Sequence, residues 1–365
     1  QAIYVTDASR AVGVVSSLLS EDSKTGYVDT IRGEYAKVAA AHARSEAEKK
    51  RLPLPRAREN AHKLDWQAYQ PVAPSFTGTK VFDHYDLEEL SKYIDWTPFF
   101  QTWEMKGRFP AILEDEKQGE AARQLYADAQ AMLDRIVSEK WLTARGVAGL
   151  WPCRRQGDDI IVHVEDEKHY TLPMLRQQIQ KREGRANMCL ADFISHDGDW
   201  MGGFAVGIHG IEPHLARFKA SIDDYSDILL KALADRLAEA FAERLHHFVR
   251  TALWGYAEGE QLTNEALIME QYRGIRPAPG YPACPEHSLK TILFDMLDAH
   301  HATGITLTES FAMLPTAAVS GFYFGHAQSE YFGVARVGRD QLEEYAGRRG
   351  IDLETAERYL RPNLD

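Results

Sequence analysis

The sequence predicts an α+β fold with a central, largely antiparallel sheet. Segments with strand character do not follow helical segments one for one, as they would in a parallel βαβ fold. No strand leads through a G-x-G-x-x-G loop into a helix, and the glycines of Met-Gly-Gly-Phe-Ala-Val-Gly-Ile-His-Gly lie inside a strand pattern. The fold is therefore not expected to be of the Rossmann type.

The first 79 residues change pattern twice. Gln-Ala-Ile-Tyr-Val-Thr has strand character and an apolar helical pattern follows it. Since one strand and one helix cannot form a core, we interpret residues 1–20 as the end of a domain that begins upstream. Residues 21–49 favour a helix, and residues 51–79, with four prolines and Trp66, indicate a tether. The predicted division is 1–20, a helix and linker over 21–79, and a main domain over 80–365.

Within the main domain, helical and strand patterns are mixed. Helices are predicted over 87–94, 114–140, 213–253 and 285–300. A further helix is expected to begin at a cap formed by Asp95, and two short helices are expected at the end of the chain. Strands are predicted over 146–153 and 159–164 as a hairpin, and over 201–208, 311–324 and 331–337.

Composition excludes several classes of protein. The net charge of −12 argues against a nucleic-acid partner, which requires a basic surface. No apolar run approaches the roughly 20 residues of a membrane span, so no membrane partner is expected. The three cysteines are scattered, without a C-x-x-C pair, which favours a reducing, cytoplasmic setting. The fourteen histidines form no H-E-x-x-H pattern, and no metal site is predicted.

The most informative segment is Arg-Pro-Ala-Pro-Gly-Tyr-Pro-Ala-Cys-Pro-Glu-His, residues 276–287. Its prolines restrict the backbone and Gly280 permits a sharp bend before Tyr281, so the loop would lose little entropy on binding. It is expected to enter a helix at Pro285. The guanidinium of Arg276 suits a small ligand with a carboxylate, because its fork matches two oxygens. A rigid connector is the alternative interpretation.

Other candidate residues lie far from this loop in sequence. Asp95 either caps a helix or holds a ligand's ammonium or hydroxyl groups. Glu239 lies on a polar helix face, and Glu270 ends a predicted exposed helix, so solvent is the alternative partner of both. Tyr331 and Phe332 begin a predicted strand, where neighbouring side chains point to opposite faces and at most one lines a cleft. No G-x-S-x-G elbow or Walker loop is present.

Four motifs together resemble a known family. The proline-rich loop, Ile-Asp-Trp-Thr-Pro-Phe-Phe, Lys-Ala-Leu-Ala-Asp-Arg-Leu-Ala-Glu-Ala-Phe and Leu-Thr-Glu-Ser-Phe-Ala-Met are similar to the C-terminal reactivation domain of cobalamin-dependent methionine synthase. The resemblance runs along essentially the whole chain. It implies a C-shaped α+β domain with a twisted sheet flanked by helices. The opening Ala-Ile-Tyr-Val-Thr-Asp-Ala-Ser-Arg resembles the end of that enzyme's cobalamin domain.

The resemblance also implies a function. In this family the domain presents S-adenosylmethionine, as methyl donor, for the reductive methylation of inactive cob(II)alamin. This supports methyl transfer from methyltetrahydrofolate to homocysteine in the whole enzyme. Cobalamin is bound mainly by the upstream domain, and zinc belongs only to the homocysteine domain. Binding and orientation suffice for this task, because the sulfonium already activates the methyl group.

The site residues follow by position. Arg276 would pair with the methionyl carboxylate, and Ala278, Gly280 and Tyr281 would line the ligand. Asp95, Glu239 and Glu270 match acidic positions in or near the site. Tyr331 and Phe332 match an aromatic pair, although Phe332 has no hydroxyl and would stack or contact the ligand through its backbone. Ala8 would lie against the cobalamin.

Expected partners are the cobalamin domain and flavodoxin or a flavoprotein reductase, bound by a monomer. The fragment alone is expected to lack turnover. Two alternatives remain at this point. One is an interaction module that caps the cobalamin domain and docks the reductant, with ligand binding secondary. The other is a stand-alone methyltransferase, which the missing catalytic base disfavours.

Overall fold

The computed structural model describes residues 14–15, 17–19, 21–48, 51–165 and 168–364. The chain divides into two compact units, Gln1–Leu52 with Ile179–Glu183, and Pro53–Gln178 with Gly184–Asp365. In the smaller unit, α2 spans Glu21–Glu48, which confirms the helix predicted over 21–49. The strand predicted at the start of the chain falls outside the described residues.

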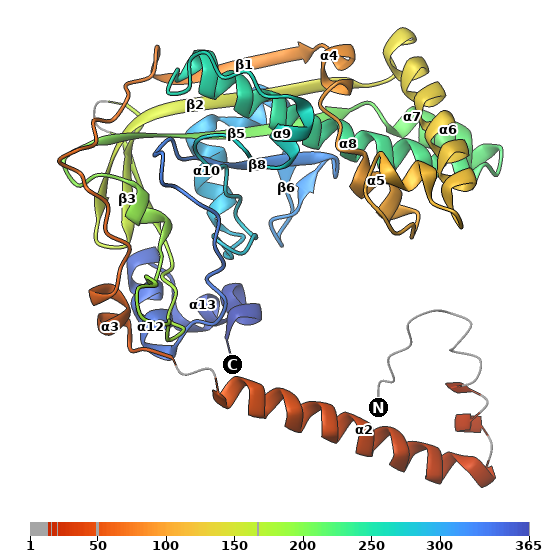
Figure 1. The fold of residues 1–365 in the computed structure, drawn as a ribbon, viewed down its shortest axis with the longest axis horizontal. Coiled ribbons are helices and arrows are strands. Elements are labelled where there is room, and N and C mark those ends of the chain that lie inside the picture. Colours follow the sequence, from red (N-terminus) through yellow and green to blue (C-terminus); the bar gives the residue numbers. More distant parts are fainter. Residues whose placement is uncertain (1–13, 16, 20, 49–50, 166–167, 365) are drawn as a thin grey trace. The chain divides into compact units, whose positions relative to one another are not determined.

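The larger unit is built on an antiparallel sheet (Figure 1). Among the described residues the strand order is β4-β3-β2-β5-β8, and β1 also pairs with β2. Every pair in this sheet is antiparallel, which confirms the predicted fold class. The strands are β1 (Gly78–Tyr85), β2 (Thr143–Gln156), β3 (Asp159–His163), β4 (His169–Pro173), β5 (Asp199–His209) and β8 (Ala318–Tyr323), with a separate pair of β6 (Thr306–Leu307) and β7 (Met313–Leu314).

Helices flank this sheet. Those of the larger unit are α3 (Leu54–Glu59), α4 (Leu87–Ser91), α5 (Trp96–Thr102), α6 (Gly119–Ser138), α7 (Glu212–Ala220), α8 (Asp224–Phe248), α9 (Asn264–Ile268), α10 (Leu289–Leu297), α11 (Ala299–Thr303), α12 (Arg339–Arg349) and α13 (Leu353–Leu360). Asp95 caps α5 and Asp223 caps α8, each by accepting a backbone N–H bond in its first turn.

Alternate side chains of the sheet enter two separate cores. On β2, Ala148 and Leu150 join the core formed with α4, α5, α6 and α8. Val147 and Trp151 point the other way, into the core formed with α10 and α11. Tyr323 of β8 belongs to the first core and therefore faces α8, the helix that carries part of the candidate site.

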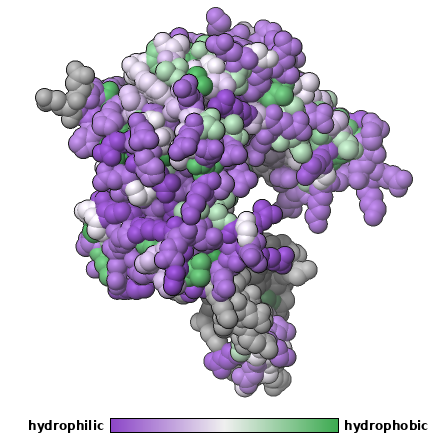
Figure 2. All heavy atoms as spheres, turned by 60° about the vertical axis from the view of Figure 1, so that its left-hand side comes forward, coloured by the Kyte–Doolittle hydropathy of each residue, from purple (hydrophilic) through white to green (hydrophobic). Residues whose placement is uncertain are grey.

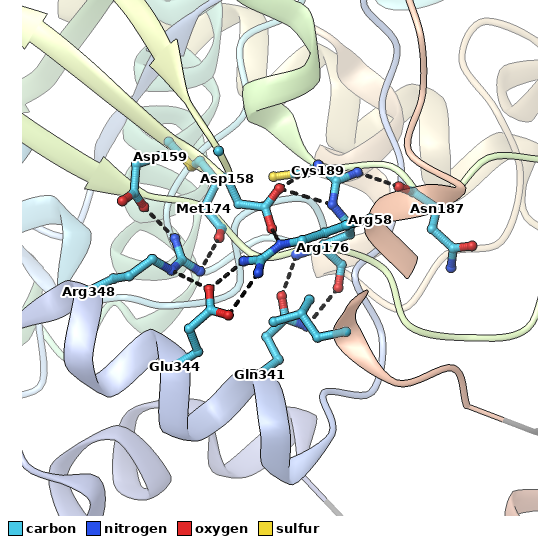
Figure 3. A network of polar contacts seen from close by, with 12 residues as sticks. Arg58, Asp158, Asp159, Met174, Arg176, Asn187, Cys189, Gln341, Glu344 and Arg348 are labelled. Atoms are coloured by element: carbon cyan, nitrogen blue, oxygen red, sulfur yellow. Dashed lines mark hydrogen bonds and ion pairs between the residues drawn. The ribbon is translucent and has the colours of Figure 1, made fainter. Parts of the chain in front are cut away.

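A buried charge network fastens α3 and α12 to the β2–β3 hairpin (Figure 3). The fully buried Arg176 donates to Asp158 at 3.0 and 2.5 Å and to Asp192 at 2.8 Å. Arg58 of α3 reaches Asp158 at 2.8 Å and pairs with Glu344 of α12. Residues 53–79, predicted as a tether, lie within the larger unit, and the division into 1–20, 21–79 and 80–365 stays a prediction.

Four predicted elements are wrong in their extent or type. The strand predicted over 311–324 is divided into β7 and β8, which belong to different sheets. The helix predicted over 213–253 is interrupted between α7 and α8, where Ile222 takes a left-handed φ of 55°. The helix expected from Pro285 begins only at Leu289. Residues 331–337 do not form a strand, since Ala335 has a φ of 58° and turns the chain out of extended geometry.

One face of the molecule is mainly hydrophilic (Figure 2). On the face seen in Figure 2, hydrophilic residues dominate and hydrophobic ones are scattered. In the part of the chain that the structure describes, none of the helices combines the length and the apolar character needed to cross a membrane.

Candidate functional site

The proline-rich loop, residues 276–287, is held along its whole course by backbone bonds. Ile275 exchanges two bonds of 3.0 Å with Phe324, and Phe322 N–H donates to the Pro277 carbonyl at 2.9 Å. Arg276 therefore leaves the backbone between two residues fixed to β8 or its end. Farther on, the Val334 N–H donates to the Pro282 carbonyl at 2.8 Å. The predicted rigidity of the loop thus has a structural basis.

The bend at Gly280 requires glycine. Its φ is +100°, and a Cβ at this position would lie 2.2 Å from a ring carbon of His287. The bend is closed by Gly280 N–H donating to the Cys284 carbonyl at 2.7 Å and Tyr281 N–H donating to the Ala278 carbonyl at 3.1 Å. The bend turns Tyr281 outward, with 61% of its surface exposed.

The Arg276 side chain contacts three residues, two on α8 and one in the loop that follows α9. Its Nη2 donates to Glu243 Oε2 at 2.7 Å, and its Nη1 donates to the Tyr272 hydroxyl at 2.8 Å and to His246 Nδ1 at 3.2 Å. The Arg276 backbone N–H donates to the Tyr331 hydroxyl at 3.0 Å. The side chains of Arg276 and Glu243 are 19% and 8% exposed. A cation and its counter-ion are thus preassembled in a largely buried position.

The electrostatics keep Arg276 charged and His246 neutral. Burial lowers the pKa of Arg276, but Glu243, Tyr272 and Tyr331 together outweigh it and hold the pKa above the ordinary value. Burial, together with the charges of Arg250 and Arg276, lowers the pKa of His246 well below its usual range. Because a guanidinium only donates, the His246 Nδ1 must be the accepting nitrogen, which places its proton on Nε2.

Two of the predicted acids lie near the loop. Glu239 is half-buried one helical turn before Glu243 on α8. Burial, followed by the Glu239 charge, raises the pKa of the Tyr281 hydroxyl. Glu270, at a left-handed φ of 55° just after α9, has its pKa raised by burial and pulled down by Arg276. Each carboxylate therefore interacts electrostatically with a residue of the predicted site, Glu239 with Tyr281 and Glu270 with Arg276.

Asp95 lines a cavity of about 630 Å³. Its Oδ1 accepts from the Thr97 N–H at 2.9 Å, as a helix cap does, and its Oδ2 makes no hydrogen bond among the described residues. The cavity is also lined by Arg108 and by α9, which leads within two residues to Glu270. No direct bond joins Asp95 to Arg276 in the described part of the chain.

Tyr331 and Phe332 lie outside any strand and make different contacts. Tyr331 is 40% exposed and its hydroxyl accepts from Arg276. Phe332 is half-buried and packs against the core beneath the loop, 6.4 Å from the Phe193 ring. Ala278 is half-buried within the loop. Ala8 lies outside the described residues, so its expected contact stays a prediction.

Comparison with known proteins identifies the family. The model of the family "vitamin B12 dependent methionine synthase, activation domain" matches residues 86–350. The chain belongs to this family. A solved structure of the MetH reactivation domain bound to AdoHcy is 49% identical in sequence and has a TM-score of 0.83, with the match covering 86% of this chain and 98% of that one. These findings confirm the recognition and the fold expected from the sequence motifs.

In this methionine synthase activation domain, three partners of Arg276 were not predicted from sequence. Glu243, His246 and Tyr272 all contact its guanidinium. Glu243 follows Glu239 by four residues on one helix, which was a usable signal that both share a face. Tyr272 precedes Arg276 by four residues outside any helix, and no periodicity pointed to it.

Proposed function

We propose that this activation domain binds S-adenosylmethionine for the reactivation of methionine synthase, with Arg276 holding the ligand's carboxylate. The observation that carries the proposal is the unused edge of its guanidinium. Nη1 is taken by Tyr272 and His246, and one Nη2 hydrogen by Glu243. Among the described residues Nε makes no hydrogen bond, so Nε–H and the Nη2 hydrogen that Glu243 leaves remain for the two oxygens of a carboxylate.

The remaining predicted residues suit the rest of the ligand. Glu239, Glu270 and Asp95 offer carboxylates, of which one takes the ammonium group. Tyr281, which is exposed, offers an aromatic face to the positively charged sulfonium. Ala278 and Gly280 offer backbone groups. Because the Phe332 ring is directed at Phe193, we assign its ligand contact to the backbone, not to stacking.

The proposed chemistry requires no acid–base pair from the protein. S-adenosylmethionine supplies a methyl group that its sulfonium already activates, so the protein's task is to bind and orient it. The family places this domain in a multidomain cobalamin enzyme, a methyltransferase. We expect no turnover by the domain alone, and propose the cobalamin domain and a flavodoxin-like reductant as its partners.

Calorimetry of the whole chain with S-adenosylmethionine tests the proposal. Arg276→Ala should weaken binding by about 2 kcal/mol or more, roughly 30-fold, because a charged hydrogen-bond partner is lost. Arg339→Ala is the matched control, since Arg339 lies on α12 with a 62% exposed side chain. Unchanged affinity in Arg276→Ala would show that Arg276 does not bind the ligand's carboxylate. Failure of the unaltered chain to bind would favour the interaction-module alternative.

A further inference from the structure

Tyr272 occupies a fixed position behind Arg276. Its ring lies 4.1 Å from the Arg250 guanidinium carbon and meets the His246 ring edge-on at 4.9 Å. Arg250 is fully buried and donates to Glu260 at 2.6 Å, so it cannot move away without breaking that pair. Tyr272 is thus held in place by Arg250 and His246.

The Tyr272 hydroxyl is suited to accept from a cation. Burial raises its pKa far above the ordinary value, outweighing the opposing effect of Arg276, so the phenol stays neutral. The hydroxyl accepts from Arg276 Nη1 at 2.8 Å. The neighbouring Tyr331 side chain adds to this rise in the pKa of Tyr272. Tyr331 in turn accepts from the Arg276 backbone, so that two hydroxyls restrain one arginine.

This restraint matters because an arginine side chain has several rotatable bonds. Glu243 contacts Nη2 alone and would permit the guanidinium to swing about that contact. Nη1 supplies a second point through two bonds, one to Tyr272 at 2.8 Å and a longer one to His246 Nδ1 at 3.2 Å. The shorter bond to Tyr272 helps to set the direction of the remaining edge, which carries Nε–H. Orientation of that edge is useful only to a ligand that places a carboxylate against it.

We propose that Tyr272 is a positioning residue for carboxylate recognition, acting through Arg276 without touching the ligand. The inference rests on the proposed binding of S-adenosylmethionine. It predicts that loss of the Tyr272 hydroxyl weakens the binding of ligands that carry the amino-acid carboxylate and leaves the binding of a ligand without that carboxylate unchanged. General damage to the fold would weaken both.

The test compares Tyr272→Phe with the unaltered chain against S-adenosylmethionine and decarboxylated S-adenosylmethionine, by calorimetry. The variant keeps the ring between Arg250 and His246, so the fold is retained, and thermal unfolding checks this. We expect about tenfold weaker binding of S-adenosylmethionine, the effect of one hydrogen bond to a charged group. Binding of the decarboxylated ligand should change by less than about twofold.

Two controls make the test specific. Tyr225→Phe removes a hydroxyl that bonds Asp128 at 2.7 Å away from the loop, and should alter neither affinity. In an Arg276→Ala background, Tyr272→Phe should have no further effect, because its target is gone. Equal weakening of both ligands, or of neither, overturns the role of Tyr272. If the unaltered chain binds neither ligand, the proposed function itself fails.

Discussion

At the scale of single residues, the Arg276–Glu243 pair explains how a cation can be held in a largely buried position before a ligand arrives. An unpaired buried charge costs several kcal/mol, and Glu243, at 2.7 Å, offsets that cost. Glu243 Oε1 is buried without a hydrogen-bond partner among the described residues. The carboxylate of the proposed ligand would therefore meet an arginine that is already largely desolvated and oriented, so that little further ordering of the side chain is needed on binding.

Gly280 provides a residue-scale prediction. Gly280→Ala should lower the free energy of unfolding by about 2 kcal/mol or more, because alanine is strained at a φ of +100° and its Cβ would displace His287. It should also weaken S-adenosylmethionine binding, since the bend carries Tyr281. Urea unfolding and calorimetry measure the two effects.

Gly333→Ala is the matched control for this change. The added Cβ would meet only Pro282, at an ordinary 3.6 Å, in a segment that touches the same loop. We expect a change of less than about 0.5 kcal/mol. If Gly280→Ala were as harmless as Gly333→Ala, the bend could not be what holds the loop.

The sequence could predict Arg276 and the loop because both are local. Prolines, a glycine and a cation within twelve residues indicate rigidity and charge by themselves. It could not predict Glu243 or Tyr272 as partners of Arg276. Glu243 lies 33 residues away along the chain, and its contact arises only when α8 packs across the sheet. Tyr272 is placed by a non-helical turn, for which no periodic pattern exists.

At the scale of elements, local patterns were reliable where tertiary contacts agreed with them. The β2–β3 hairpin and the Asp95 cap were predicted correctly. The strand predicted over 331–337 was wrong although its tyrosine, phenylalanine and valines are residue types that favour strands. Its backbone is held by single bonds, such as Val337 N–H to the Asn363 carbonyl at 2.8 Å, and Ala335 interrupts any ladder.

The buried network around Arg176 gives an element-scale prediction (Figure 3). Arg176→Met should lower the free energy of unfolding by about 3 kcal/mol or more, because it leaves the carboxylates of Asp158 and Asp192 buried with fewer partners. Arg339→Met removes two exposed pairs of α12 and should cost less than about 1 kcal/mol. Chemical denaturation compares them. Similar losses of unfolding free energy in both variants would mean that burial of the network adds nothing to the stability of the fold.

At the scale of the whole molecule, the proposed ligand residues gather in one compact unit. Asp95, Glu239, Glu270, Arg276 and Tyr331 all fall within Pro53–Gln178 and Gly184–Asp365. In the described part of the chain, every bonded partner of Arg276 belongs to that unit as well. Ligand binding should therefore be a property of the larger unit by itself.

Two deletions test where that unit begins. Removal of residues 1–52 should leave the affinity for S-adenosylmethionine within about twofold and the melting temperature within about 3 °C, since the unit begins at Pro53. Removal of residues 1–79 takes away α3, whose Arg58 bonds Asp158 and Glu344, and Val72, whose carbonyl accepts from Trp254 at 2.7 Å. It should lower the melting temperature by about 10 °C or more, because buried carboxylates lose a partner and core surface is exposed.

Calorimetry of both proteins decides between the two domain boundaries, residue 53 and residue 80. Equal stability of the two would support a domain that begins near residue 80, whereas a loss confined to the longer deletion makes residues 53–79 part of the ligand-binding unit.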